Sequence, residues 1–165
     1  TPRHVSIPLL RRLFTFDLMQ VSLTPAVAAD IKRAAEDQIL LRLESLSIGE
    51  KTALARRASG RVAAALLQEP DERVSKPALD NSQLTEAHVI QALMKPVAPE
   101  KLFLLLCRHS KWSQRHEVQA ALLRSEKTPP DVAAEFLDHF STEALRQMVS
   151  EPRLEQLLTT RHKPR

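Results

Sequence analysis

One short segment holds several side chains that could bind a metal ion or a partner. His109, Trp112 and His116 lie close together, and Cys107 comes just before them. A metal site on a helix would need histidines on adjacent helical turns and a third ligand nearby. A turn separates His109 from His116, and Cys107 falls at an apolar position. There it is expected to be a small buried hydrophobe with a raised pKa. We therefore predict no metal here.

The same segment is better interpreted as part of the fold. His109 stands where Asn81 and Ser125 stand elsewhere, two residues after an apolar position, so we expect its ring to cap backbone groups. Trp112 stands at the position of Leu84, and we expect it to pack between helices. The alternative is that Trp112 is an exposed anchor for a partner.

Basic side chains are a second source of chemistry. The chain has 24 Lys and Arg against 20 Asp and Glu, a net charge of +4. Basic residues near successive turns can align into a stripe that neutralises phosphates, although acidic residues are interleaved with them. The candidate binding surface consists of Arg56, Arg57, Arg61, Arg73, Arg108, Lys111, Trp112, Arg115 and Arg124.

No catalytic motif is recognisable. The only glycines are at positions 49 and 60, which excludes a glycine-rich phosphate loop. Ser, His and Asp occur without a nucleophile elbow. Asp71 and Glu72 precede Arg73 at a predicted helix start, where the helix dipole explains the two carboxylates. We expect a non-enzymatic protein with no catalytic residue, no metal and no cofactor.

The sequence also bears on compartment. A single cysteine excludes an internal disulfide and a cysteine-rich metal or iron-sulfur site, and it favours a reducing compartment. No stretch reaches the roughly 18 apolar residues of a membrane span. The start of the chain lacks a secretory signal. We predict a cytoplasmic protein with no membrane partner.

The elements that position these side chains repeat along the sequence. Seven times an apolar residue ends a predicted helix and a polar residue follows two positions later. The apolar positions are Leu67, Leu79, Leu93, Cys107, Leu123, Leu137 and Val149. Helices this short bury little surface alone, so they must stack. Paired, they form units of roughly 28 to 30 residues, as in helical solenoids.

Helix boundaries follow from proline and capping signals. Five prolines fall at predicted helix starts, where proline is tolerated. Ser47 and Glu50 form a predicted capping box. Ser59 and Gly60 are expected to stop the helix that follows it. Predicted helices span residues 25–46, 47–58, 61–68, 71–80, 85–94, 99–108, 113–124, 129–139, 142–150 and 152–159.

We predict one all-α domain over residues 1–165. Residues 1–46 form N-terminal cap helices, residues 47–159 form helical repeats, and residues 160–165 form a frayed basic tail. The segment 5–23 holds more apolar residues than one helix face can bury. They include Leu9, Leu13, Phe14, Phe16 and Leu18. Self-association through this segment is therefore a further hypothesis.

Two segments carry a family resemblance. Over Arg73–Thr85 and Glu117–Pro129 the chain resembles bacterial HEAT-like proteins of the leucine-rich-repeat-variant kind. The resemblance covers roughly Ala53 to Leu158. It implies a right-handed α-solenoid, a superhelix of short antiparallel helix pairs. Some variant-repeat proteins also hold an iron-sulfur centre in an N-terminal cysteine cluster. Nothing here matches that cluster, so no cofactor is implied.

We expect a scaffold that presents a concave surface to a protein partner, because its mixed charge suits a protein better than a phosphate backbone. The alternative is nucleic-acid binding through the basic stripe. HEAT-like bacterial DNA glycosylases use a basic concave surface, together with several aromatics and a catalytic Asp. This chain has one Trp and no Tyr. The alternative requires the basic side chains to converge on one face with the acids elsewhere.

Overall fold

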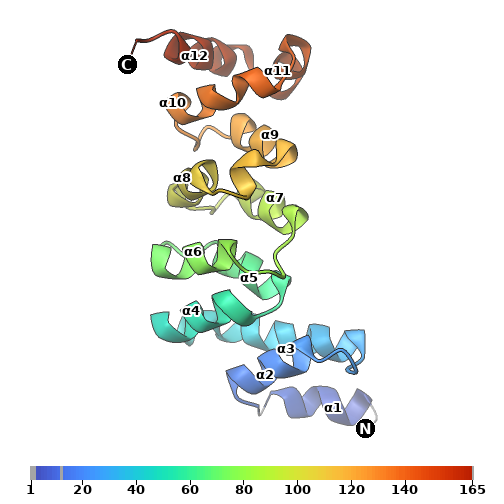
Figure 1. The fold of residues 1–165 in the computed structure, drawn as a ribbon. Coiled ribbons are helices and arrows are strands. Elements are labelled where there is room, and N and C mark those ends of the chain that lie inside the picture. The colour runs from blue at the N-terminus through green and yellow to red at the C-terminus, as the bar shows by residue number, and fades with distance from the viewer. Residues whose placement is uncertain (1–2, 12, 165) are drawn as a thin grey trace. The chain divides into compact units, whose positions relative to one another are not determined.

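The computed structural model describes residues 3–11 and 13–164, and all regular structure within them is helical (Figure 1). This confirms the all-α fold class. The chain divides into two compact units, an N-terminal unit of residues 1–88 and a C-terminal unit of residues 89–165. The predicted single domain, with a cap boundary after residue 46, stays a prediction.

The N-terminal unit is built around the longest of its helices, α3. Its helices are α1 (Arg3–Leu10), α2 (Thr15–Leu23), α3 (Ala29–Arg42), η1 (Leu43–Ser45), α4 (Ile48–Arg57), α5 (Gly60–Leu66) and α6 (Glu72–Leu79). Helix α3 packs against α1, α2 and α5, and α4 packs against α5 and α6. Leu18, Ile39, Leu54 and Val74 are fully buried between these helices.

The C-terminal unit is also built of short helices. Its elements are α8 (Glu100–Arg108), η2 (Trp112–Gln114), α9 (His116–Arg124), α10 (Pro130–Ala133), η3 (Ala134–His139), α11 (Thr142–Met148) and α12 (Glu151–Arg161). Helix α7 (Glu86–Met94) runs across the boundary between the units. Helix α9 packs against α8 and α11, and α10 packs against α12.

The repeated apolar position is a core position throughout. All seven residues that hold it are buried, with between 0% and 9% of each exposed. The capping box is also confirmed. The Ser47 hydroxyl accepts a hydrogen bond from the Glu50 amide at 3.2 Å, and the Glu50 carboxylate accepts one from the Ser47 amide at 2.9 Å.

Some predicted helix starts are wrong. The helix expected from residue 25 begins at Ala29, and the Thr24 hydroxyl instead donates to the Gln20 carbonyl at the end of α2. The helix before Ser59 ends at Arg57, close to its predicted end, but Gly60 is already the first residue of the next helix, α5. A Cβ atom at position 60 would lie 2.2 Å from the Gln83 carbonyl oxygen and 2.6 Å from Cε1 of His88. Glycine is therefore required by close packing.

The predicted fraying of residues 160–165 is wrong for the first two of them. Thr160 and Arg161 belong to α12. The Thr160 hydroxyl donates to the Gln156 carbonyl at 2.8 Å, and the Arg161 guanidinium pairs with Asp138 at 2.7 Å. The ion pair holds this end of the helix against η3, which the composition of the tail alone did not indicate.

Side chains repeatedly reach back by about one helix pair to hydrogen-bond backbone carbonyls. Each donor serves two carbonyls that lie at or near an earlier turn, 23 to 31 residues back in the chain. The predicted length of a helix pair, roughly 28 to 30 residues, lies within this range. The bonds run from Arg42 to Leu13 and Arg11, from Asn81 to Ala55 and Ala58, from Lys127 to Pro96 and Ala98, and from Arg153 to Ser125 and Thr128.

Candidate binding surfaces

The candidate basic residues of the N-terminal unit fall into two classes. Arg56 and Arg57 end α4 and are exposed. Arg61 bonds to Glu36 at 3.3 Å and to Asp37 at 2.6 Å. Arg73 forms a forked pair with the carboxylate of Asp71, at 2.7 Å for the shortest contact. Two of the four arginines are thus neutralised by adjacent acids.

The pKa values of the paired arginines agree with this geometry. Burial acts to lower the pKa of Arg61, but the hydrogen bonds and charges of Asp37 and Glu36 raise it overall. Hydrogen bonding to Asp71 likewise raises the pKa of Arg73. Both guanidinium groups are stabilised as cations by their own chain, so they add little to any field that would attract a phosphate backbone.

The C-terminal unit places its candidate residues around one turn and two helix ends. Arg108 ends α8, Arg124 ends α9, and both are exposed. The Lys111 ammonium lies 4.2 Å from the centre of the Trp112 ring. Trp112 itself is only 1% exposed. Its inclusion in the binding surface is therefore wrong, because a side chain packed in the core cannot anchor a partner, and the packing interpretation is confirmed.

The predicted structural roles of His109 and Cys107 are confirmed. His109 Nδ1 accepts hydrogen bonds from the amides of Lys111 at 3.2 Å and Trp112 at 3.4 Å. The side chains of Asn81 and Ser125 accept from backbone amides at the equivalent position of their turns. Cys107 is buried, and burial raises the pKa of its thiol to about 12. His109 therefore caps the amides of its own turn, and Cys107 is a buried thiol of the core.

Helix dipoles explain where the basic residues lie. Arginines occupy the last turns of α4, α8 and α9, whereas Glu117 and Asp131 occupy the first turns of α9 and α10. Cations stabilise helix C-termini and anions stabilise N-termini. Each turn joins a C-terminus to an N-terminus and so receives both signs. Four of the nine candidate residues belong to the N-terminal unit and five to the C-terminal unit, so a continuous stripe stays a prediction.

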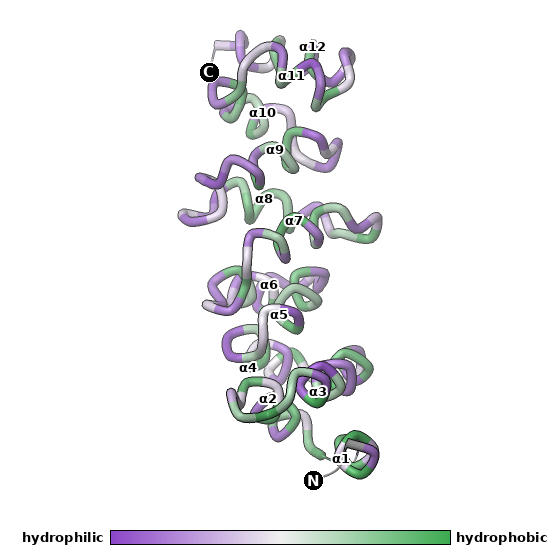
Figure 2. Tube along the Cα trace, turned by 90° about the vertical axis from the view of Figure 1, so that its right-hand side faces the viewer, coloured by the Kyte–Doolittle hydropathy of each residue, from purple (hydrophilic) through white to green (hydrophobic). Residues whose placement is uncertain are grey.

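The N-terminal segment exposes several apolar side chains. Figure 2 shows α1 as one of the most hydrophobic stretches of the trace. Leu18 is fully buried, but Phe14 remains 82% exposed. The other large apolar side chains exposed in this unit are Val5, Ile7, Leu9, Phe16 and Leu41. Self-association through this surface stays a prediction, which sedimentation at increasing concentration would test.

Sequence reasoning missed a hollow in the C-terminal unit, which we name the imidazole hollow. It has a volume of about 530 Å³. It is lined by Cys107, Ser113, Gln114, His116, Gln119, Glu135, Phe136 and His139. Its residues come from the end of α8, from η2, from α9 and from η3, so no single stretch of sequence revealed it. A polar Gln119 within the apolar run of α9 was the one available signal.

A hydrogen-bond relay fixes the orientation of His139 in this hollow. Gln119 is 4% exposed, and its Nε2 donates to the Ser113 carbonyl at 2.7 Å. A carbonyl only accepts, so this bond assigns the amide orientation, and Oε1 is then the acceptor for His139 Nδ1 at 2.8 Å. Nδ1 must carry the proton. In the neutral ring, Nε2 is left with the lone pair.

The remaining walls of the imidazole hollow are aromatic and acidic. The His116 ring stacks on Phe140 with centroids 4.3 Å apart. Burial is the main cause of the raised pKa of the Cys107 thiol, but the charges of Glu135 and Asp131 also raise it, and only Arg108 is an opposing charge. Among these charges, that of Glu135 has the largest effect on the pKa of the thiol.

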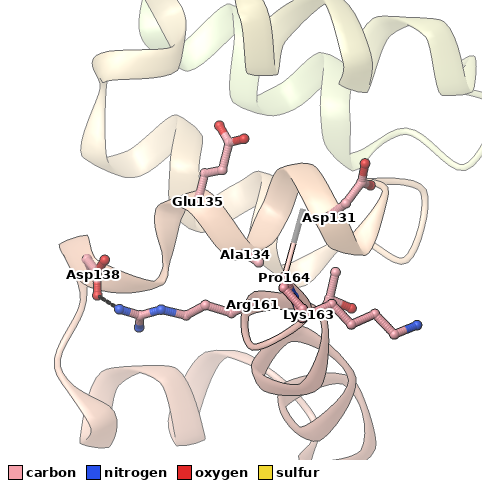
Figure 3. A pocket seen from close by; sticks show the side chains of 8 residues that line it. Asp131, Ala134, Glu135, Asp138, Arg161, Lys163 and Pro164 are labelled. Atoms are coloured by element: carbon pink, nitrogen blue, oxygen red, sulfur yellow. Dashed lines mark ion pairs between the residues drawn. The ribbon is translucent and has the colours of Figure 1, made fainter.

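A second hollow is formed by η3 together with α10 and α12, and we name it the acidic hollow. Its volume is about 580 Å³. It is lined by Asp131, Ala134, Glu135, Asp138, Thr160, Arg161, Lys163 and Pro164. Figure 3 shows Arg161 reaching Asp138 from α12, while Asp131 and Glu135 extend from the facing helical segment. Glu135 lines both hollows, which makes it the common residue of the two sites.

The described residues offer neither a cluster of metal ligands nor a membrane-spanning helix. Within residues 3–11 and 13–164, no group of three or more His, Cys, Asp or Glu side chains could hold a metal ion. None of the helices in these ranges has the length and apolar character needed to cross a membrane. Comparison of the chain with protein-family models, with curated proteins and with solved structures finds no match.

Proposed function

We propose that this chain is a non-enzymatic scaffold, a right-handed HEAT-like α-solenoid that presents a concave surface to a protein partner. The recurring bonds from side chains to carbonyls about one helix pair back support the repeat architecture. Repeats joined in this way form a rigid surface suited to extended ligands. The free thiol of Cys107 supports a reducing compartment, and we place the scaffold in the cytoplasm.

The observation that carries the proposal of protein binding is the pair of hollows that η3 helps to line. Their volumes of about 530 and 580 Å³ suit individual side chains or short peptide segments. Their walls combine carboxylates, cations, imidazoles and aromatic rings, which matches the mixed chemistry of a protein surface. Glu135 stands between them and would contact a partner that occupies either one.

Selection from a random peptide library displayed on phage tests this proposal. The immobilised chain should enrich defined sequences, and Glu135→Lys should weaken their binding at least about tenfold, because the reversed charge would alter both hollows. Glu155→Lys is the matched control, since Glu155 is exposed on α12 and lines neither hollow. Failure to enrich any sequence, or equal binding by the two variants, would argue against a protein-binding scaffold.

One observation favours nucleic-acid binding as the second candidate. Arg56, Arg57, Arg108 and Arg124 are exposed and form no ion pair with another described residue. Binding to a labelled DNA duplex and to single strands, measured by fluorescence anisotropy at about 50 to 200 mM salt, distinguishes the candidates. Phosphate contacts give a steep decline over this range.

Charge reversal locates any such contact. Under the nucleic-acid proposal, Arg56→Glu with Arg57→Glu, or Arg108→Glu with Arg124→Glu, should reduce both the affinity and the salt slope. Arg61→Glu is the comparison, because Arg61 is already paired with acids. Absence of binding at the lowest salt removes this candidate and leaves the protein scaffold.

A further inference from the structure

The imidazole hollow contains a preorganised hydrogen-bond acceptor. The Gln119 amide is engaged at both ends, because its Nε2 donates to the Ser113 carbonyl and its Oε1 bonds to His139 Nδ1. No described residue donates a hydrogen bond to His139 Nε2. In its neutral form the ring therefore offers its Nε2 lone pair to a ligand, while Gln119, itself almost completely buried, holds the ring in place. A ligand that donates a hydrogen bond would not have to order this side chain on binding.

The charged residue that lines the hollow favours a positively charged ligand. Glu135 lines the hollow, and its charge affects the pKa of the Cys107 thiol more than the opposing charge of Arg108 does. A cation that enters is attracted by the carboxylate of Glu135, the one acidic side chain among the residues that line this hollow. An anion would be repelled by the same carboxylate.

The walls suit a long aliphatic stem behind the charge. Phe136 lines the hollow, and the His116 ring packs against Phe140 at an interplanar angle of 35°. Lys and Arg side chains lay their methylene groups along such apolar surfaces while the charged head reaches polar groups. The neutral thiol of Cys107 adds no competing charge. Acceptor, charge and stem surface lie together in one hollow of about 530 Å³.

We infer that the imidazole hollow binds the cationic side chain of a lysine or arginine on the partner. The ammonium or guanidinium donates to His139 Nε2 and is attracted by Glu135, and its stem lies against Phe136 and the His116 ring. The inference rests on the proposed protein-binding function and specifies the partner as one with an exposed basic residue. A partner that inserts a phosphorylated or acidic side chain is the outcome opposed to it.

Nuclear magnetic resonance titration with small blocked peptides tests the inference directly. Four probes of the form acetyl-Gly-X-Gly-amide differ only in X, which is lysine, arginine, norleucine or glutamate. The lysine or arginine probe should produce saturable shifts in the ring signals of His116 and His139, at concentrations up to about 10 mM, as suits a single side chain. Norleucine and glutamate probes should not. The rings of His4 and His88, in the other unit, are internal references.

Variants separate specific binding from general attraction. Glu135→Gln keeps the size of the side chain and removes its charge. It should reduce the affinity for the lysine and arginine probes about tenfold. Glu155→Gln is the same change outside both hollows, and it should leave the affinity for these probes unchanged. The inference is overturned if the glutamate probe binds more tightly, if Glu155→Gln has the same effect as Glu135→Gln, or if no basic probe shifts the two rings.

Failure of the inference can be told apart from failure of the proposed function. If phage selection yields peptides whose affinity is unchanged when every lysine and arginine is replaced by norleucine, the scaffold binds protein but not through a cationic side chain. If no peptide is enriched, protein binding itself fails.

Discussion

The two glycines of the chain should respond to alanine substitution with opposite signs. Gly60→Ala places a Cβ atom 2.2 Å from the Gln83 carbonyl oxygen and 2.8 Å from Nδ1 of His88. Gly49→Ala meets only the Ser47 hydroxyl, at 4.0 Å. Both glycines lie in helices of the N-terminal unit, and the chemical change is identical. The difference between the variants therefore isolates the effect of packing.

The expected magnitude follows from these contacts. Overpacking of a core costs about 1 to 3 kcal/mol. Gly60→Ala belongs at the upper end, because the nearest obstacle is a backbone oxygen that can move only with the turn that carries it. We expect a loss of about 3 kcal/mol, which for a unit of this size lowers Tm by roughly 10 to 20 °C. Gly49→Ala should gain up to about 1 kcal/mol from the lower conformational entropy of the unfolded chain.

Urea and thermal unfolding followed by far-ultraviolet circular dichroism measure both changes. Trp112 is the sole tryptophan and lies in the C-terminal unit, so its fluorescence reports separately on that unit. If Gly60→Ala stays within about 0.5 kcal/mol of the parent chain, the close approach to Gln83 does not govern stability. An equal loss in Gly49→Ala would show that the effect belongs to glycine in helices generally, and would refute the packing argument.

Three further outcomes are expected. Asn81→Asp should lower the free energy of unfolding, measured in urea, by about 3 kcal/mol, because a carboxylate cannot donate to the Ala55 and Ala58 carbonyls. The loss should be larger than that caused by Asn81→Ala. At pH 8 the folded Cys107 thiol should react with a disulfide reagent roughly 1,000-fold more slowly than the unfolded thiol, because burial raises its pKa from 9.0 to about 12. The free energy of unfolding should correspondingly fall as pH rises from 9.0 to about 12, because the thiol ionises first in the unfolded chain. Equal reaction rates of the folded and unfolded thiols would contradict the burial of Cys107. The backbone amide of Ser47, and then its hydroxyl, lower the pKa of Glu50 below 4.5, so the stabilisation by this carboxylate is complete above 4.5 and is lost as pH falls through the folded value. Glu50→Gln should make the loss of stability at acid pH less steep. An unchanged dependence of the unfolding free energy on pH, measured by urea unfolding, would contradict the assignment.

Features that depend on neighbouring residues could be predicted from the sequence. The seven buried apolar positions follow from helical spacing, and the Ser47 capping box requires only residues three apart. The cap made by His109 was predictable for the same reason, because its partners are the next amides in its own turn. Local hydrogen bonding and helix periodicity decide these features, and both are written in consecutive residues.

Features that depend on distant residues could not be predicted in this way. The role of Gly60 depends on a turn more than 20 residues later in the chain, which no local pattern indicates. Arg61 counted as a candidate phosphate ligand until its contacts with α3 were known. The relay from Gln119 to His139 joins α9 to η3 across another turn. A polar residue in an apolar helical run indicates such a partner but does not identify it.

The bonds that link one helix pair to an earlier turn have a consequence for how such a chain can change over time. The donor is Arg42, Asn81, Lys127 or Arg153, whereas the acceptors are always backbone carbonyls, which every residue supplies. Any side chain that reaches and donates can therefore replace another without loss of the link. Insertion or deletion of a whole pair preserves the register between donor and acceptor, but loss of a single helix breaks it. The stack can thus tolerate extensive sequence divergence, provided that its length changes in steps of complete pairs.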